Sequence, residues 1–144
     1  MNDVFIKRLD ATLEMPAPAH NGDAGADVRT REAFTLEPGT WRLVPLGFAL
    51  SMPQNCVAYV MPRSGLAVRN GVTILNSPGV IDSGYRGEVN AVLINHGGEA
   101  VEFERGDRVA QIIISEMSGF NWQEVSELDE TERGTGGFGS TGVK

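Results

Sequence analysis

The chain has 144 residues, of which 41% are hydrophobic and 22% charged, so it fits one soluble globular domain with a sizeable core. Its formal net charge of -7 argues against non-specific binding to nucleic acid, and no apolar run approaches the roughly 18 residues of a membrane span. The single cysteine, Cys56, excludes an internal disulfide and a cysteine-cluster metal site, and we expect it in the core.

The N-terminus, Met-Asn-Asp-Val-Phe, lacks a basic region followed by a long apolar one. We therefore expect no signal peptide and a cytoplasmic, reducing location.

Short apolar or alternating segments follow one another along the chain, separated by turn residues. We expect strands at residues 4–9, 34–36, 41–50, 56–61, 72–75, 89–94, 101–104 and 109–115. Turns recur about every 8 to 12 residues, a spacing typical of an all-β barrel or sandwich. The one helix expected spans residues 64–70, with Ser64 as its N-cap and Gly71 just after its last turn.

Residues 76–88 concentrate chemical groups in one loop, between apolar segments that are predicted to form a hairpin or bent strand pair. The loop contains the amide of Asn76, the carboxylate of Asp82 and the ring of Tyr85. A half-shielded acid at a strand end can serve as a general base, because partial burial tunes its pKa. The alternative is that Asp82 only caps a turn by bonding to its own backbone.

Other segments offer candidates for binding an anion. Arg63-Ser64-Gly65 brings a guanidinium, a hydroxyl and backbone N–H groups to the start of the predicted helix, although a capped surface turn would look the same. Asp27 follows small residues at the edge of a strand, where a tight turn is the alternative. Gln111 is polar within an apolar run and therefore needs a partner from protein, water or ligand.

The end of the chain changes character twice. Residues 118–132 are acidic and carry no basic residue, and residues 133–142 are rich in glycine. A glycine-rich end is usually a disordered tail, but glycines beside hydroxyl groups can also wrap phosphates with backbone N–H groups. The segment is not a Walker A loop, since no Gly-Lys-Ser/Thr follows.

Five segments, in this order, resemble the five motifs of the trimeric dUTP diphosphatase (dUTPase) family. They are Ala24-Gly-Ala-Asp-Val, Pro62-Arg-Ser-Gly-Leu-Ala, Gly79-Val-Ile-Asp-Ser-Gly-Tyr-Arg-Gly-Glu-Val, Gly106-Asp-Arg-Val-Ala-Gln and Arg133-Gly-Thr-Gly-Gly-Phe-Gly-Ser-Thr-Gly. One such motif would be weak, but five in order at fitting distances are specific. A small departure is Val68-Arg69-Asn70-Gly71, where a lysine or histidine is more usual.

The resemblance implies an all-β, jelly-roll-like barrel with one short helix, assembled as a homotrimer. It implies a barrel domain over residues 1–117 and a linker and arm over residues 118–144, which closes a neighbouring subunit's active site. The implied reaction is Mg²⁺-assisted attack of water on the α-phosphate of dUTP. The products are dUMP and diphosphate, which keeps uracil out of DNA and supplies dUMP for thymidylate synthesis. No nucleic-acid or membrane partner is implied.

The resemblance also implies roles for the loop residues. Asp82 orients and deprotonates the attacking water and contacts the sugar 3′-OH, while Tyr85 packs against deoxyribose and leaves no room for a 2′-OH. Asn76 and the backbone of Gly79, Val80, Ile81 and Asp82 read the uracil edge. Asn90, close behind the loop, is a further candidate for contact with the ligand.

Phosphate and metal roles fall on the remaining motifs. Ser64 and Gly65 hold the α- and β-phosphates, with Arg63 and Gln111 near them, and Asp27 holds Mg²⁺ through water. In the arm, Arg133 meets the γ-phosphate. Phe138 stacks on uracil, and Gly139 and Ser140 add phosphate contacts.

Three alternatives belong to other classes of protein. A dCTP deaminase shares the barrel but lacks both the Ile-Asp-x-x-Tyr hairpin and the Arg-Gly-Thr-Gly-Gly-Phe arm, and both are present here. The others are a non-catalytic nucleotide-binding protein on the same scaffold and a structural β-sandwich with an idle tail.

Overall fold

The computed structural model describes residues 3–137 as an almost entirely antiparallel β structure with one short helix. The strands are β1 (Phe5–Arg8), β2 (Ala26–Arg29), β3 (Phe34–Leu36), β4 (Trp41–Pro45), β5 (Phe48–Ser51), β6 (Cys56–Met61), β7 (Val72–Ile74), β8 (Gly79–Asp82), β9 (Asn90–Asn95), β10 (Val101–Phe103) and β11 (Arg108–Glu116). The helix is α1 (Ser64–Asn70). The predicted all-β class with one short helix is confirmed.

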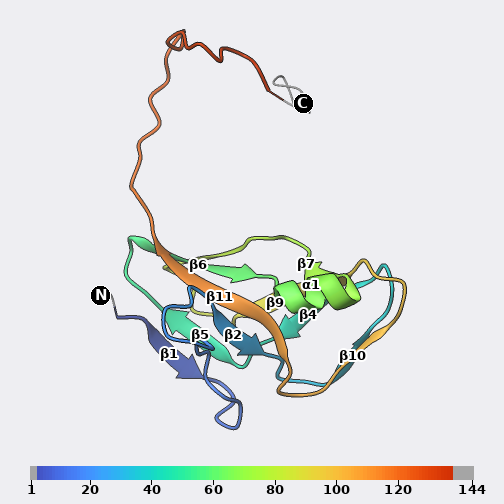
Figure 1. The fold of residues 1–144 in the computed structure, drawn as a ribbon. Helices are drawn as coiled ribbons and strands as arrows, with labels where there is room; N and C mark the ends of the chain where they lie inside the picture. Colours follow the sequence, from blue (N-terminus) through green and yellow to red (C-terminus); the bar gives the residue numbers. More distant parts are fainter. Residues whose placement is uncertain (1–2, 138–144) are drawn as a thin grey trace.

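Two sheets supply most of the core. The larger has the strand order β2-β11-β6-β8, of which Figure 1 labels β2, β11 and β6. The other has the order β4-β9-β7, while β1 pairs with β5 and β10 with β3. In β9 buried and half-buried residues alternate, as the period of two requires when one face of a sheet packs inward. Val28 and Val60 from the larger sheet and Val44 and Leu93 from the other belong to one buried cluster. The arrangement is that of a jelly-roll-like sandwich or barrel.

The predicted strand pair around residues 76–88 is present, with an added strand. β7 pairs with β9, as expected for a hairpin. Between them the chain forms β8, which leaves that sheet and pairs with β6 of the larger one. The loop therefore bridges the two sheets, and both of its ends are fixed by strand pairing.

Two predicted details are wrong. The predicted strand 41–50 is interrupted at Gly47, which has φ 78° and separates β4 from β5. Gly47 suits this break because a Cβ there would lie 2.8 Å from Cδ1 of Leu13, and because its φ is one that L side chains rarely adopt. Ser64 is not the N-cap: Arg63 holds that position without a side-chain cap hydrogen bond, while Gly71 ends the helix as expected.

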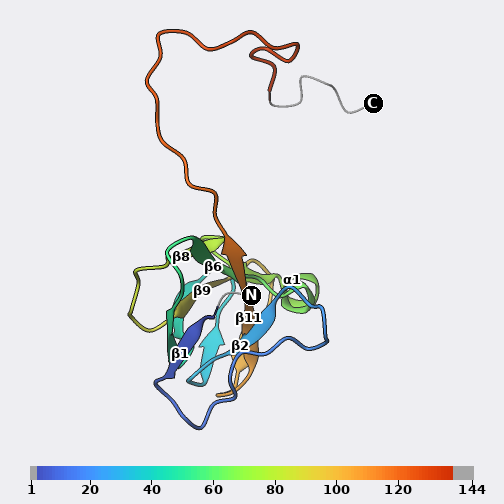
Figure 2. The same cartoon turned by 90° about the vertical axis from the view of Figure 1, so that its left-hand side faces the viewer.

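The chain after β11 leaves the sheets and runs away from them (Figures 1 and 2). Residues 117–135 are exposed throughout. The boundary between a barrel over residues 1–117 and an arm over residues 118–144 stays a prediction. Cys56 is buried, as predicted. Within residues 3–137, no helix combines the length and apolar character needed to cross a membrane.

Candidate active site

Three of the five motif segments meet at one end of the larger sheet. Gln111 of β11 lies opposite Asp27 of β2 on one side and opposite Met61 of β6 on the other. Its Nε2 donates to the backbone oxygen of Pro62 at 2.9 Å. The partner expected for this polar side chain is therefore a backbone group of the protein. A Cβ on Gly25 would lie only 2.2 Å from Oε1 of Gln111, so the glycine allows the amide to fill this space.

Asp27 holds two arginines at this junction. Nε and Nη2 of Arg63 donate to its two carboxylate oxygens at 2.8 and 3.3 Å, and Nη1 of Arg108 donates to Oδ2 at 3.3 Å. A planar guanidinium gripped by a carboxylate on two atoms is fixed in direction as well as in charge. Arg108 was not among the predicted site residues, although it lies within the fourth motif segment.

Ser64 and Gly65 follow directly, at the start of α1. Because Arg63 is the N-cap, the Ser64 hydroxyl is not used for capping, and it has no hydrogen-bond partner in the part of the chain that the structure describes. Gly65 lies beneath the guanidinium of Arg69, which a Cβ would approach to 2.9 Å. This corner therefore presents basic side chains and an uncommitted hydroxyl, a combination suited to phosphate oxygens.

A separate cleft of about 370 Å³ lies beside the loop 83–88 and is lined by Leu43, Val80, Ile81, Asp82, Tyr85, Glu88, Val89 and Asn90. Besides Asp82, four predicted site residues line this cleft: Val80, Ile81, Tyr85 and Asn90. The expected half-shielding of Asp82 is wrong for the single chain: Asp82 is exposed at the end of β8. Its backbone oxygen accepts the N–H of Tyr85 at 3.0 Å. Its carboxylate accepts no hydrogen bond from residues 3–137, so the alternative of a turn-capping aspartate has no support in this geometry.

Tyr85 and Asn90 are held by one carbonyl group. The Tyr85 hydroxyl donates to the backbone oxygen of Glu88 at 3.0 Å, and Nδ2 of Asn90 donates to the same oxygen at 2.8 Å. Tyr85 as a whole residue remains 46% exposed, and it lines the cleft.

Asn76 and Gly79 lie at the other end of β8. Gly79 is buried against Val60, and a Cβ on it would be 3.6 Å from Nδ2 of Asn76. The Asn76 amide therefore packs over the start of β8, about 10 Å along the strand from Asp82.

The cleft lies far from the arginine corner within one chain. We use the name arginine corner for the group formed by Asp27, Arg63, Ser64, Gly65 and Arg108. Asp82 pairs with Val57, near the beginning of β6, whereas Arg63 follows the end of β6. Six residues of extended chain correspond to about 20 Å. One copy therefore does not bring Asp82 and its own Arg63 to the same phosphate.

The remaining predicted residues belong to the arm. Arg133 is exposed, and its Nε donates to the backbone oxygen of Gly136 at 2.9 Å. Phe138, Gly139 and Ser140 lie outside the described residues.

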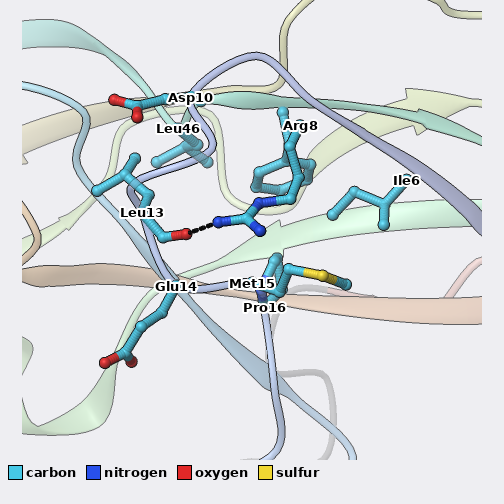
Figure 3. A pocket seen from close by; sticks show the side chains of 10 residues that line it. Ile6, Arg8, Asp10, Leu13, Glu14, Met15, Pro16 and Leu46 are labelled. Carbon is cyan, nitrogen blue, oxygen red and sulfur yellow. Dashed lines mark hydrogen bonds between the residues drawn. The ribbon is translucent and has the colours of Figure 1, made fainter.

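A further cavity, of about 10 Å³, lies beneath the loop after β1, where Arg8 donates to the backbone oxygen of Leu13 at 2.5 Å (Figure 3). It has room for about one water molecule and none for a nucleotide, and no predicted site residue lines it.

Comparison with known proteins supports the motif resemblance. The sequence model of the dUTPase family matches residues 11–142. The deoxyuridine 5′-triphosphate nucleotidohydrolase of Alkaliphilus metalliredigens is 44% identical over 144 residues, which is 100% of both chains. That of Gloeobacter violaceus is 48% identical over 141 residues, or 96% of each chain.

Solved structures agree in fold. A mutant dUTPase of Staphylococcus bacteriophage 80alpha with dUpNHpp has a TM-score of 0.90 and 26% identity, covering 99% of this chain and 100% of that one. A mutant dUTPase of phage phi11 of S. aureus, described with a structural Mg(II) ion, has a TM-score of 0.79 and 24% identity, covering 88% and 98%. With a family model that matches almost the whole chain and relatives this similar over their full length, the chain belongs to the dUTPase family.

Proposed function

We propose that this protein hydrolyses dUTP to dUMP and diphosphate, at a site assembled from more than one copy of the chain in a homotrimer. The observation that carries the proposal is the uncommitted carboxylate of Asp82 at the rim of a cleft that also holds Tyr85. In the cell the reaction keeps uracil out of DNA and supplies dUMP for thymidylate synthesis. We assign it to the cytoplasm, where a single buried thiol stays reduced.

In the proposed mechanism Asp82 accepts a proton from a water molecule. The oxygen of that water forms a bond to the α-phosphorus. The bond from the α-phosphorus to the α,β-bridging oxygen breaks, diphosphate leaves, and the proton passes from Asp82 to solvent. Catalysis consists mainly of positioning and charge neutralisation, as in phosphoryl transfer generally.

The loop 83–88 and strand β8 select the nucleotide. The Tyr85 ring packs against deoxyribose, and its fixed hydroxyl leaves no freedom to yield to a 2′-OH. Asn76 and the backbone from Gly79 to Asp82 read the uracil edge. A close fit excludes the thymine methyl, while unpaired polar groups reject cytosine, which is the stronger form of discrimination.

The arginine corner of a second copy binds the phosphates. Ser64 and Gly65 bind the α- and β-phosphates beside Arg63, whose direction Asp27 fixes. Gln111 supports this loop through its hydrogen bond to Pro62. The separation of about 20 Å between Asp82 and Arg63 in one chain is the physical reason for a shared site.

Mg²⁺ fits this corner only together with the substrate. Asp27 is already bonded to two arginines, and residues 3–137 contain no cluster of three or more metal-ligating side chains. Mg²⁺ in nucleotide enzymes is held largely by phosphates and water, so contact with Asp27 through water suits the donor set. When bound, the ion neutralises phosphate charge. Direct ligation by several protein groups does not fit.

We further propose that residues 118–144 form the arm that closes a neighbouring copy's site. Arg133 would meet the γ-phosphate and Phe138 would stack on uracil, with Gly139 and Ser140 on the phosphates. Residues 117–135 are exposed and run away from the sheets before the chain turns at residues 132–135, a course that supports reach to another copy (Figure 2). A closed arm excludes water from the site and commits the substrate.

Hydrolysis of dUTP with Mg²⁺ in ¹⁸O-labelled water tests the reaction. We expect dUMP carrying the label and unlabelled diphosphate, because water attacks the α-phosphorus. Label in diphosphate, or release of single phosphates, would contradict this mechanism.

Mixed trimers test the shared site. Asp82→Asn and Arg63→Ala chains are each expected to be inactive alone. When co-refolded at equal amounts, about a quarter of the sites should combine an intact Asp82 with an intact Arg63 from another copy. Failure of the mixture to regain activity, while its trimers form normally, would show that one chain supplies both residues.

A further inference from the structure

Glu88 lies in the wall of the Asp82 cleft and has two different sets of contacts. Its backbone oxygen accepts the Tyr85 hydroxyl at 3.0 Å and the Asn90 amide at 2.8 Å. Its side chain extends away from these contacts: Oε1 accepts the backbone N–H of Gly47 at 2.9 Å. Contacts that hold the Glu88 side chain therefore also help to fix the position of the Glu88 backbone oxygen, to which the Tyr85 hydroxyl donates.

The Gly47 anchor is itself fixed from the opposite side. Its backbone oxygen accepts the N–H groups of Leu9 and Asp10 at 2.8 and 3.1 Å. Its N–H therefore points at Glu88 from a rigid break between β4 and β5. A charge-assisted hydrogen bond from a fixed backbone donor is among the stronger single contacts in a protein.

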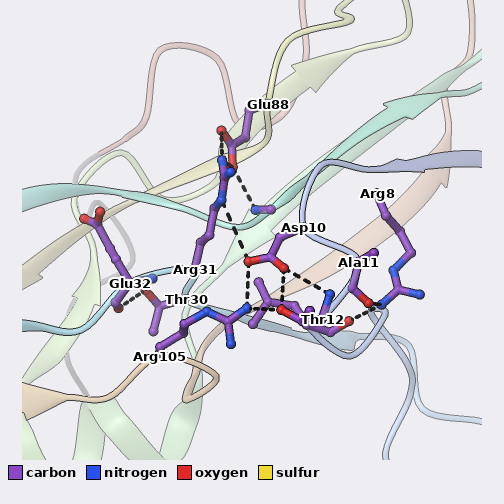
Figure 4. Close-up of polar contacts among 11 residues, drawn as sticks. Arg8, Asp10, Ala11, Thr12, Thr30, Arg31, Glu32, Glu88 and Arg105 are labelled. Atoms are coloured by element: carbon purple, nitrogen blue, oxygen red, sulfur yellow. Dashed lines mark hydrogen bonds and ion pairs between the residues drawn. The ribbon is translucent and has the colours of Figure 1, made fainter.

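Arg31 supplies the countercharge for Glu88. Its Nη1 lies 3.4 and 3.3 Å from the two carboxylate oxygens, and its backbone N–H donates to Pro45 at 2.9 Å. Nε of Arg31 is 3.9 Å from Oδ2 of Asp10, to which Nη2 of Arg105 also donates, at 2.7 Å. Figure 4 shows Arg31 between the two carboxylates, which links the loop after β1 to the Glu88 anchor.

The Tyr85 ring has little room beyond these contacts. A Cβ on Gly87 would lie 2.3 Å from the Tyr85 hydroxyl oxygen, so the phenol sits directly over the glycine backbone. The loop leaves β8 at Asp82, fixed by pairing with β6, and returns at Glu88. Its first end is held by strand pairing. Its second end is held by backbone hydrogen bonds between Val89 and residues Phe48 and Leu46, and the Glu88 side chain adds a further anchor beside them.

We propose that Glu88, held by Arg31 and the Gly47 N–H, is a positioning residue that fixes the Tyr85 ring and thereby sets how strictly ribonucleotides are refused. The specificity part rests on the proposed hydrolysis of dUTP. Without the anchor, the Glu88 backbone oxygen is held only through its neighbour Val89, the Tyr85 hydroxyl loses its fixed acceptor, and the ring can yield to a 2′-OH. Glu88 touches no reacting atom in this scheme.

Graded variants separate the two contacts of the side chain. Glu88→Gln keeps an acceptor for the Gly47 N–H but loses the ion pair with Arg31, and Glu88→Ala loses both. Arg31→Lys keeps the charge but not the planar fork. Glu32→Gln is the matched control, because it removes an ion pair of Arg42, 2.7 Å long, that takes no part in the loop.

The measurement is kcat/KM for dUTP and for UTP with each variant. For Glu88→Ala we expect roughly a 10- to 100-fold loss with dUTP, the size of a small misplacement of a catalytic loop. We expect a smaller loss with UTP, so that discrimination falls roughly tenfold. Glu88→Gln and Arg31→Lys should lie between wild type and Glu88→Ala, and Glu32→Gln should match wild type. An unchanged ratio of the two values in folded Glu88→Ala would overturn the proposal.

A second readout needs no turnover. The chain has two tyrosines, Tyr59 and Tyr85, so ¹³C-labelled tyrosine rings give an assignable pair of signals. We expect the Tyr85 signal to shift in Glu88→Gln and Arg31→Lys while that of Tyr59 stays. Unmoved Tyr85 signals would refute the positioning role. A wild type that leaves dUTP intact would refute only the proposed function, which keeps the two failures distinct.

Discussion

Gly25→Ala places a methyl group where the structure has no room for one. The added Cβ would lie 2.2 Å from Oε1 and 3.1 Å from Cδ of Gln111. Cβ atoms do not approach other atoms this closely, so the Gln111 amide must turn away. In doing so it gives up its 2.9 Å hydrogen bond to Pro62, the residue just before Arg63 and Ser64.

The free-energy cost can be worked out from these contacts. The lost hydrogen bond costs about 1 kcal/mol. Crowding adds about 1 kcal/mol, at the low end for overpacking because the displaced atoms are the end of a flexible side chain. The lower backbone entropy of unfolded alanine returns about 0.5 kcal/mol. The net loss of about 1.5 kcal/mol corresponds to a Tm lower by roughly 3 to 6 °C.

Thermal unfolding of matched variants is the assay. Gly98→Ala is the control, because a Cβ there meets nothing within 4 Å. Gln111→Ala alone should also lose the Pro62 bond, and the double variant should be no less stable than Gln111→Ala, since no amide is left to collide with the added methyl group. The KM for dUTP should rise in Gly25→Ala as the phosphate loop loses its support. A Gly25→Ala protein as stable as Gly98→Ala would show that the Gln111 amide does not need this space.

Three further predictions concern the base, the arm and one acidic network. Asp82→Asn should lower kcat at least about 100-fold while dUTP still binds, which stopped-flow binding and turnover assays would separate. Deleting residues 133–144 should leave a folded trimer by light scattering but remove most turnover, and unchanged kcat would refute the lid. Hydrogen bonds from Thr12 and Arg105 hold the pKa of Asp10 well below its ordinary value of 3.8, so its contribution to stability is complete above about pH 4 and is lost as pH falls through the lowered pKa. Asp10→Asn should therefore be less stable than wild type at pH 7, with the gap closing below about pH 4, and a gap independent of pH would contradict this.

The fold was largely predictable because its signals are local. Alternation, β-branched residues and turn pairs mark the strands, and the helix spans the predicted residues 64–70. The break at Gly47 was missed because its cause is not local: the N–H of Gly47 is held by Glu88, 41 residues away, and its Cα faces Leu13. The addition of β8 to the larger sheet likewise depends on pairing with β6, which no short pattern reveals.

The candidate site was predictable in its residues but not in its geometry. Motif resemblance named Asp27, Arg63 and Gln111, yet their direct contacts arise from the order of β2, β11 and β6 in the sheet. Arg108 was missed because its contact with Asp27 spans 81 residues. A basic residue within the fourth motif, close to a predicted anion site, was the signal that could have found it.

The most direct test of the account is the release of diphosphate from dUTP, dTTP, dCTP and UTP, each with Mg²⁺, followed alongside the release of ammonia. We predict rapid release of diphosphate from dUTP, at most a trace from the other three, and ammonia from none. Ammonia from dCTP would mean deaminase chemistry on the same barrel, and diphosphate from UTP at the rate of dUTP would contradict the role of Tyr85. No product from any of the four would contradict the proposed hydrolysis itself.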